Sequence, residues 1–135
     1  MFNAIARGTA TVANYAPGND CAATIKILTM LGVEIERTPA RDRDGDTVIV
    51  HGMGSDALRE PDDVLYAGGS GTTMRLMSGI LAGRPFMSVL TGDDTVRVRP
   101  MDRIIKPLSQ MGATVHGRGG KFPPLVFAGG TQTLG

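Results

Sequence analysis

Residues 27–35 read ILTMLGVEI, and residues 107–115 read PLSQMGATV. In both stretches an apolar helical pattern runs up to a glycine, a usual place for a helix to stop, and a short strand pattern follows. A turn and a second strand come next in each case, TVIVHG at 47–52 and PLVFAGG at 124–130. The offset is about 80 residues, which indicates two copies of a helix–strand–strand unit.

Further elements lie around these copies. TATVANY at 9–15 and PFMSVLTG at 85–92 have the composition of strands, and GTTMRLMSGILAG at 71–83 has helical spacing. Together the elements predict an α/β fold of the α+β kind, built from repeated βαβαββ units. A unit of this kind buries one sheet face against helices. Residues 1–135 hold about one and a half such copies.

Local signals set the expected boundaries. Gly8 is expected to stop a first helix in MFNAIARG, and Asn19 or Asp20 to cap the helix that ends at Gly32. Pro100 suits the first position of the helix at 100–111. We expect a hairpin turn at Asp44–Gly45, irregular chain over 53–67, a polar connection over 93–99 and a loop over 129–135.

Composition excludes several classes of protein. The formal net charge is +1, aromatic residues make up 4% and Trp is absent, so neither a nucleic-acid partner nor a membrane surface is expected. No apolar run reaches the roughly 18 residues of a membrane span. The single cysteine, Cys21, forms no disulfide framework and indicates a reducing, cytoplasmic location.

The stretch YAGGSGTTMR at 66–75 is the first candidate site. Small residues run straight into a helix, where free amides and the helix dipole attract an anion. Gly69 and Gly71 would let a ligand approach the backbone closely. The alternative is structural, with Thr72 or Thr73 capping the helix. The stretch 66–75 is neither a P-loop nor a dinucleotide-binding fingerprint, because the residues that follow its glycines do not fit either pattern.

A basic cluster in TGDDTVRVRPMDRIIKP at 91–107 is the second candidate. Arg97 and Arg99 are two residues apart, so an extended segment would present both on one side. Such guanidinium groups can clamp a carboxylate or phosphate through two parallel bonds. The alternative is a solvated charged edge. If consecutive strands end on one edge of the sheet, both candidate loops lie there together and suit a small dianion.

The two histidines give no sign of a metal site. His51 and His116 each end a predicted strand, and neither has a metal-ligating neighbour at a recognisable spacing. We therefore expect both to be surface or hairpin residues.

Three stretches resemble the first domain of the 5-enolpyruvylshikimate-3-phosphate synthase family: 20–37, 68–83 and 85–113. The Gly-Ser-Gly-Thr-Thr-Met-Arg and Arg-Pro-Met-Asp-Arg blocks are the specific part. The family has two domains of three βαβαββ copies each, arranged as an inside-out α/β barrel. It transfers an enolpyruvyl group from phosphoenolpyruvate to shikimate 3-phosphate in the shikimate pathway, and glyphosate competes with phosphoenolpyruvate. It needs no cofactor or metal.

The resemblance implies site residues one by one. Gly71 matches the glycine that lines the phosphoenolpyruvate and glyphosate pocket, and Arg99 matches the arginine that binds phosphoenolpyruvate. Further candidates in the same motifs are Gly69, Ser70, Thr72, Arg75 and Arg97, with Arg75 expected to be structural. No catalytic residue is expected within this chain. The expectation for 1–135 is thus a partial first domain, with the second domain absent.

Two departures from the family pattern matter. The family usually has Asn where this chain has Gly69. Its Gly-Asp-Lys-Ser-x-Ser-His-Arg block, which holds shikimate 3-phosphate, would stand just before MFNAIARG and is absent. We therefore expect the chain alone to be inactive, and to contact shikimate 3-phosphate mainly through segments it lacks. One alternative is a non-catalytic fragment that needs a complementary chain. Another is a domain like UDP-N-acetylglucosamine enolpyruvyl transferase, although that family's loop cysteine is missing from 92–100.

Overall fold

The computed structural model describes residues 1–39 and 45–130 and divides the chain into two compact units, Met1–Arg59 and Glu60–Gly135. The predicted turn residue Asp44 and the end of the predicted terminal loop lie outside the described residues. The fold is mixed α/β, as predicted, and each unit has its own sheet.

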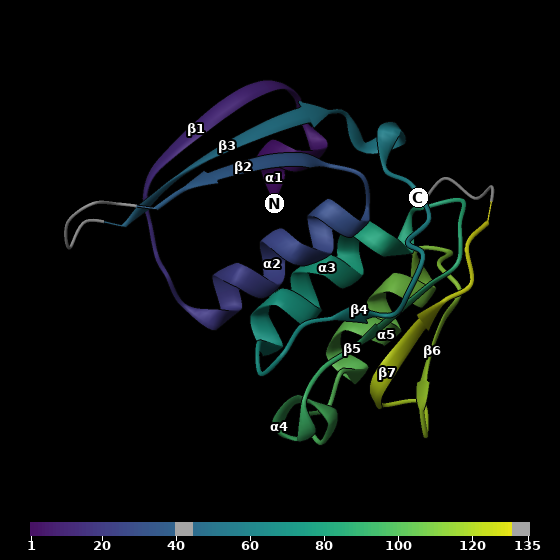
Figure 1. Cartoon of the computed structure of the whole chain (residues 1–135). Helices are drawn as coiled ribbons and strands as arrows, with labels where there is room; N and C mark the ends of the chain where they lie inside the picture. Colours follow the sequence, from purple (N-terminus) through teal and green to yellow (C-terminus); the bar gives the residue numbers. More distant parts are fainter. Residues whose placement is uncertain (40–44, 131–135) are drawn as a thin grey trace. The chain divides into compact units, whose positions relative to one another are not determined.

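The first unit has a three-stranded sheet with strand order β1-β3-β2, and both pairings are antiparallel. Helices α1 and α2 lie on one side of this sheet (Figure 1). Its elements are α1 (Phe2–Ile5), β1 (Arg7–Tyr15), α2 (Asn19–Met30), β2 (Glu34–Thr38), β3 (Asp46–Met53) and the 3-10 turn η1 (Ser55–Ala57).

The second unit has a four-stranded sheet with strand order β4-β5-β7-β6. Strands β4 and β5 are parallel, and the other two pairings are antiparallel. Helix α3 packs beside α5. The elements are β4 (Leu65–Tyr66), α3 (Gly71–Ala82), β5 (Ser88–Thr91), α4 (Asp94–Arg97), α5 (Asp102–Gln110), β6 (Val115–Arg118) and β7 (Phe122–Phe127).

The two helix–glycine–strand stretches end their helices in the same way. After α2, Gly32 has φ +91° and donates to the Thr29 carbonyl at 2.9 Å, while Val33 donates to Leu28 at 3.0 Å. After α5, Gly112 has φ +98° and makes the corresponding bond at 3.1 Å. This is the Schellman arrangement, which needs a left-handed residue and so favours glycine. The predicted stops at Gly32 and Gly112 are therefore confirmed.

Apolar side chains that recur along the helices and strands form the core. In α3 the fully buried apolar positions are Met74, Met77 and Leu81, whereas Leu76 is 55% exposed. In α2 the buried residues are Ile27 and Leu28, and Ile25 is only half-buried. The buried apolar positions of both helices thus recur at the helical period, as predicted.

Several predicted boundaries were wrong, one at the end of a helix and two at the start of a helix. Helix α1 ends at Ile5, and Gly8 lies within β1. The N-cap of α2 is Gly18, with no side-chain cap bond, so neither Asn19 nor Asp20 has the predicted role. Helix α5 begins at Asp102 with Met101 as N-cap, so Pro100 precedes the helix. In all three cases the helix begins or ends within one to three residues of the predicted position, and no side chain caps it.

Three short elements were missed, one of them the 3-10 turn η1 in the stretch 53–67 that was predicted to be irregular. Strand β4 lies within the stretch predicted to be irregular, and it has only two residues, too few for an alternating pattern. Helix α4 lies within the predicted polar connection. Its N-cap Asp93 accepts bonds from the amides of Thr95 and Val96, so an aspartate before a threonine was the available signal.

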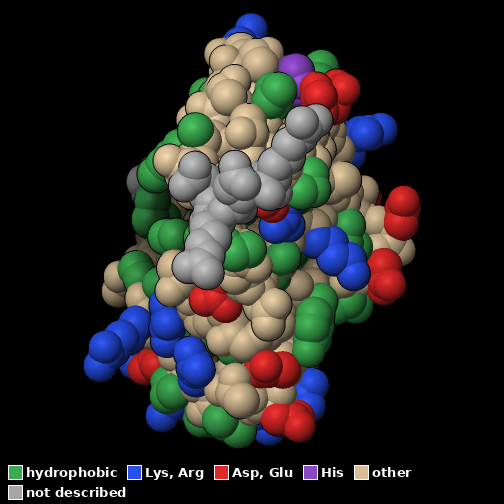
Figure 2. All heavy atoms as spheres, turned by 60° about the vertical axis from the view of Figure 1, so that its left-hand side comes forward, with side chains coloured by type: hydrophobic (Ala, Val, Ile, Leu, Met, Phe, Trp, Pro, Cys, Tyr) green, Lys and Arg blue, Asp and Glu red, His purple; other side chains and the backbone are tan. Residues whose placement is uncertain are grey.

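The surface carries charges of both signs. Figure 2 shows Lys and Arg side chains together with Asp and Glu on the face that it draws. Within the described ranges, no helix has the length and apolar character required to cross a bilayer.

Candidate functional site

The parallel pairing of β4 and β5 brings the two candidate loops together. Leu65 pairs with Leu90 and Tyr66 with Thr91, so both strands end at the same edge of the sheet. The glycine turn follows β4, and the arginine loop follows β5. A backbone bond joins the loops directly, because the Asp93 amide donates to the Gly68 carbonyl at 2.9 Å. The expectation that both loops share one edge is confirmed.

The glycine turn leads into α3 with its own cap. Gly68 has φ +58°, and Ser70 is the N-cap, fully buried, with its Oγ accepting from the Thr73 amide at 3.1 Å. A side chain therefore caps the helix, as the structural alternative predicted. The capping residue is Ser70, and not Thr72 or Thr73 as that alternative had it. Capping uses one of the free amide groups at this end, and the helix dipole still favours negative charge there.

The arginine loop is ordered by Asp93. Its Oδ1 accepts from the Thr95 amide at 2.9 Å, the Thr95 hydroxyl at 2.7 Å and the Val96 amide at 3.1 Å. These bonds, that of the Thr95 side chain above all, lower the pKa of Asp93 below its ordinary value of 3.8. The carbonyl of Thr95 in turn accepts from Arg99 Nε at 3.2 Å. The cap of α4 thereby orients the Arg99 guanidinium.

Two guanidinium groups meet at Gly71. A Cβ atom placed on Gly71 would lie 2.9 Å from Arg99 Nη1 and 3.0 Å from Arg75 Nη1. Glycine is therefore required for both cations to lie this close to the start of α3. Helix amides, a helix dipole and two guanidinium groups at one point form an arrangement suited to a small anion with two charged groups. Arg75, expected to be structural, is part of this arrangement.

Gly69 faces the opposite charge. A Cβ on this residue would lie 3.0 Å from Asp93 Oδ2 and 3.6 Å from Thr95 Oγ1. The two glycines of the turn thus differ in their neighbours. Gly71 lies against cations and Gly69 against a carboxylate.

Arg97 has other partners than Arg99. Its guanidinium pairs with Asp94 and donates to the Gly92 carbonyl at 3.2 Å. Its own carbonyl accepts from Arg118 Nη2 at 2.9 Å. The expectation that Arg97 and Arg99 extend on one side is wrong, because residues 94–97 form helix α4 and not extended chain.

An open depression adjoins Arg75. It is lined by Arg75, Pro100, Asp102, Arg103, Ile104 and Lys121. Asp102 is shared with Lys106, whose Nζ lies 3.8 Å from its carboxylate, so positive charge predominates. Lys121 comes from the turn between β6 and β7 and was missed by the sequence analysis. Only the pairing of that hairpin with β5 brings it near the arginine loop.

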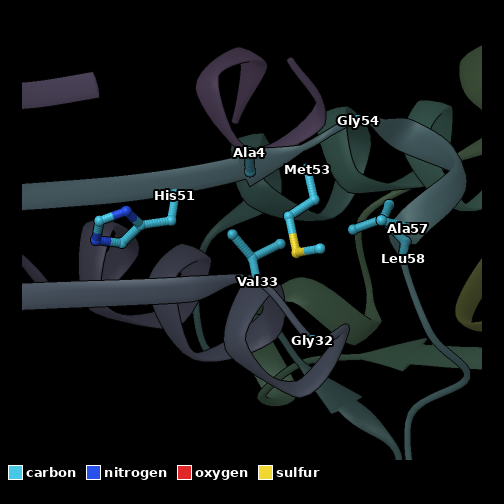
Figure 3. Close-up of a pocket in the computed structure, with 8 residues that line it drawn as sticks. All are labelled: Ala4, Gly32, Val33, His51, Met53, Gly54, Ala57 and Leu58. Carbon is cyan, nitrogen blue, oxygen red and sulfur yellow. The ribbon is translucent and has the colours of Figure 1, made fainter. Parts of the chain in front are cut away.

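A separate small pocket lies within the first unit. It is lined by Ala4, Gly32, Val33, His51, Met53, Gly54, Ala57 and Leu58. Val33 and Met53 point toward one another, and the ring of His51 lies at one end (Figure 3). Most of the lining is apolar, so this pocket offers little to hold an anion. His51 has acidic neighbours across the sheet, Glu34 and Glu36, which spacing along the chain did not reveal.

Comparison with known structures identifies the class. An EPSP synthase from Acinetobacter baumannii matches with a TM-score of 0.87 and 42% identity, over 97% of this chain and 28% of that one. The fold is therefore that of an enolpyruvyl transferase.

The family follows from the sequence matches. The family model for EPSP synthase (3-phosphoshikimate 1-carboxyvinyltransferase) matches residues 1–134, and the chain belongs to this family. It is 50% identical to the 3-phosphoshikimate 1-carboxyvinyltransferase of Bacillus subtilis (strain 168) over 130 residues, 96% of this chain. It is also 50% identical to that of Herpetosiphon aurantiacus over 132 residues. The chain spans only 29% of the length of either relative.

Proposed function

We propose that this chain supplies one wall of the phosphoenolpyruvate site of an EPSP synthase. The whole enzyme would transfer the enolpyruvyl group of phosphoenolpyruvate to shikimate 3-phosphate in the cytoplasm. The observation that carries the proposal is the approach of Arg99 and Arg75 to Gly71 at the start of α3. Phosphoenolpyruvate has a phosphate and a carboxylate, and each is a group that a guanidinium binds through paired bonds.

Each residue of the proposed site has a distinct role. Arg99 and Arg75 bind the anion, and Gly71 leaves room for both guanidinium groups and for the ligand. Ser70 holds the first turn of α3 in place by capping it. Gly69 and Thr72 border the ligand, whereas the Arg97 guanidinium is held by Asp94 and the Gly92 carbonyl and does not face the ligand. Glyphosate, an anion of similar size, would compete for the same wall.

The domain proposal follows from the order of the strands. In the second unit the order β5-β7-β6 has two antiparallel pairings, and in the first unit β1-β3-β2 has the same two. Helices α2 and α5 precede β2 and β6 and end in the same glycine motif. We therefore propose two βαβαββ repeats of a first domain, the earlier one incomplete, with further repeats and the second domain lying elsewhere.

Binding tests the proposed site without requiring catalysis. Phosphoenolpyruvate is titrated into the ¹⁵N-labelled chain, and amide shifts are followed by NMR. We expect shifts at Gly69–Thr73 and a loss of binding in Arg99→Ala. Arg97→Ala is the matched control, since it removes the same charge from the same loop but its guanidinium already pairs with Asp94. Equal weakening by both variants would contradict a specific role for Arg99.

Activity tests the proposed fragment. With both substrates the isolated chain should release no phosphate above an Arg99→Ala control, because the proposed acid and base groups lie outside it. Mixing the chain with the missing segments of a related synthase should restore phosphate release, and Arg99→Ala should abolish the restored activity. Release by the isolated chain alone would show that it is not the inactive part proposed here.

A further inference from the structure

A group of three side chains that suits a metal ion lies on the sheet of the first unit. Glu34 and Glu36 belong to β2 and His51 to β3, and one ligand atom from each lies within 4.8 Å of the other two. We propose that they bind one zinc ion.

Strand register places the three side chains on one face. Glu34 and His51 are direct partners in the antiparallel β2–β3 pairing. Glu36 is two residues beyond Glu34, and alternate residues of a strand share a face. Val48 and Val50 of β3 are buried, so His51 belongs to the face opposite to theirs. The side chains of His51 and Glu36 are 32% and 60% exposed, which leaves an ion free access.

The imidazole is already held in an orientation that suits a ligand. His51 Nε2 lies 2.8 Å from Glu36 Oε1. On the other side of the ring, Nδ1 lies 3.1 Å from the hydroxyl of Thr9, the partner of His51 across β1 and β3. A histidine that binds a metal usually donates its second N–H to such an oxygen, which fixes the tautomer. With Nδ1–H donating to Thr9, the lone pair of Nε2 is directed toward the two carboxylates.

The donor set favours zinc. One imidazole nitrogen and two carboxylate oxygens are ligands that zinc accepts in sites with three protein ligands and water at the fourth position. Two ligands on one tetrahedral zinc lie about 3.4 Å apart, given bonds of about 2.0–2.1 Å. The 2.8 Å separation of His51 Nε2 and Glu36 Oε1 has to open slightly, and any separation near the 4.8 Å limit of the group has to shorten. The exposed glutamate side chains can do both by rotation, and the ion would neutralise two like charges.

The site would join an edge strand to its neighbour. In the order β1-β3-β2, strand β2 lies at the edge of the sheet. A zinc ion held by both β2 and β3 links the two strands through side chains in addition to their backbone bonds. Because zinc would bind the folded sheet and not the unfolded chain in this geometry, it should also raise the melting temperature.

Calorimetric titration of zinc chloride into the metal-free 135-residue chain tests the proposal. We expect one ion per chain. His51→Ala should weaken binding by more than the roughly 10- to 100-fold loss typical of an outer-shell partner, and Thr9→Val should weaken it within that range. Glu34→Gln and Glu36→Gln should each weaken binding too. His116→Ala removes the other histidine and Cys21→Ser the only thiol, and both should leave the affinity unchanged.

Two further readouts separate lost binding from lost folding. Cobalt in place of zinc should give the intense visible absorption of a four-coordinate ion in the unmodified chain and in His116→Ala, but not in His51→Ala. Far-ultraviolet circular dichroism should show that His51→Ala is folded and that zinc no longer raises its melting temperature. Undiminished zinc affinity in His51→Ala, loss of binding in Cys21→Ser, or no binding at millimolar zinc would overturn the proposal.

Discussion

Replacing Gly71 by alanine separates the need for a flexible backbone from the need for space beside it. Gly71 is the first residue of α3 and does not have a positive φ, so alanine fits its backbone. Alanine in a helix is favoured over glycine by roughly 0.5–1 kcal/mol. At the same time, the new Cβ would meet Arg99 Nη1 at 2.9 Å and Arg75 Nη1 at 3.0 Å.

Both contacts are with the far ends of flexible side chains. Each guanidinium has to move away by about 0.5 Å or more to regain an ordinary van der Waals distance. Small displacements of this kind weaken paired bonds to an anion strongly, since a shift of about 1 Å at a reacting centre can lower a rate by about 100-fold. We expect Gly71→Ala to be as stable as the unmodified chain or more stable, and to bind phosphoenolpyruvate roughly tenfold more weakly.

Gly79→Ala is the control in the same helix. A Cβ at Gly79 would meet nothing within 4 Å, so this variant should gain stability and bind phosphoenolpyruvate normally. Stability is measured by urea unfolding followed by far-ultraviolet circular dichroism, because the chain has no Trp. Affinity is measured by the NMR titration. Unchanged affinity in Gly71→Ala would refute the assignment of the two arginines. A loss of more than about 1 kcal/mol of stability would refute the argument that only the space matters.

Three further predictions concern neighbouring residues. Ser70→Ala should lower the free energy of unfolding by about 1–2 kcal/mol, because it removes the buried side-chain cap of α3. Ser78→Ala, whose Oγ bonds the Met74 carbonyl in the same helix, should change it by less than about 1 kcal/mol. Equal values in urea unfolding would contradict this difference. Gly69→Asn should slow amide exchange in the glycine turn by donating to the Asp93 carboxylate, and in a complete enzyme it should change the response to phosphoenolpyruvate and glyphosate. If Gly69→Asn leaves the amide exchange of the turn, the kinetics with phosphoenolpyruvate and the inhibition by glyphosate unchanged, this prediction is wrong. The lowered pKa of Asp93 means that its ionised form stabilises the fold above pH 3.8 and that this contribution disappears as the pH falls through the folded pKa. The difference in urea midpoint between the unmodified chain and Asp93→Asn should therefore shrink below that pH, and a constant difference would contradict the prediction.

Features that depend on neighbours along the chain were predictable. The stops at Gly32 and Gly112 were found because the motif needs only a helix end and a left-handed residue. Helix α3 was found over almost its observed range because its apolar spacing is regular. The condition that consecutive strands end on one edge of the sheet was enough to expect both candidate loops there, and the parallel pairing of β4 and β5 met it.

Features that depend on rotation or register were not predictable. In an extended chain the side chains of Arg97 and Arg99 would point to the same side. Because residues 94–97 form the single turn of α4, Arg97 instead pairs with Asp94, and Arg99 lies beside Gly71. Arg75 reaches the same point from one turn along α3, and sequence spacing alone does not relate it to Arg99. Likewise, the register of β2 against β3 sets Glu34 opposite His51. Each of these placements follows from how two elements meet, and neither element shows it alone.

The glycine turn and the arginine loop form one closed ring of contacts. The Asp93 amide donates to the Gly68 carbonyl, and the Asp93 carboxylate accepts from the Thr95 amide. The Thr95 carbonyl accepts from Arg99, whose guanidinium lies beside Gly71. The ring explains why the two glycines tolerate different changes. A Cβ at position 69 displaces the Asp93 carboxylate slightly, but an amide side chain there can also donate to that carboxylate, whereas any side chain at position 71 only pushes cations away from the place where an anion would bind. The anion site is therefore more sensitive to a methyl group at Gly71 than to a larger polar group at Gly69.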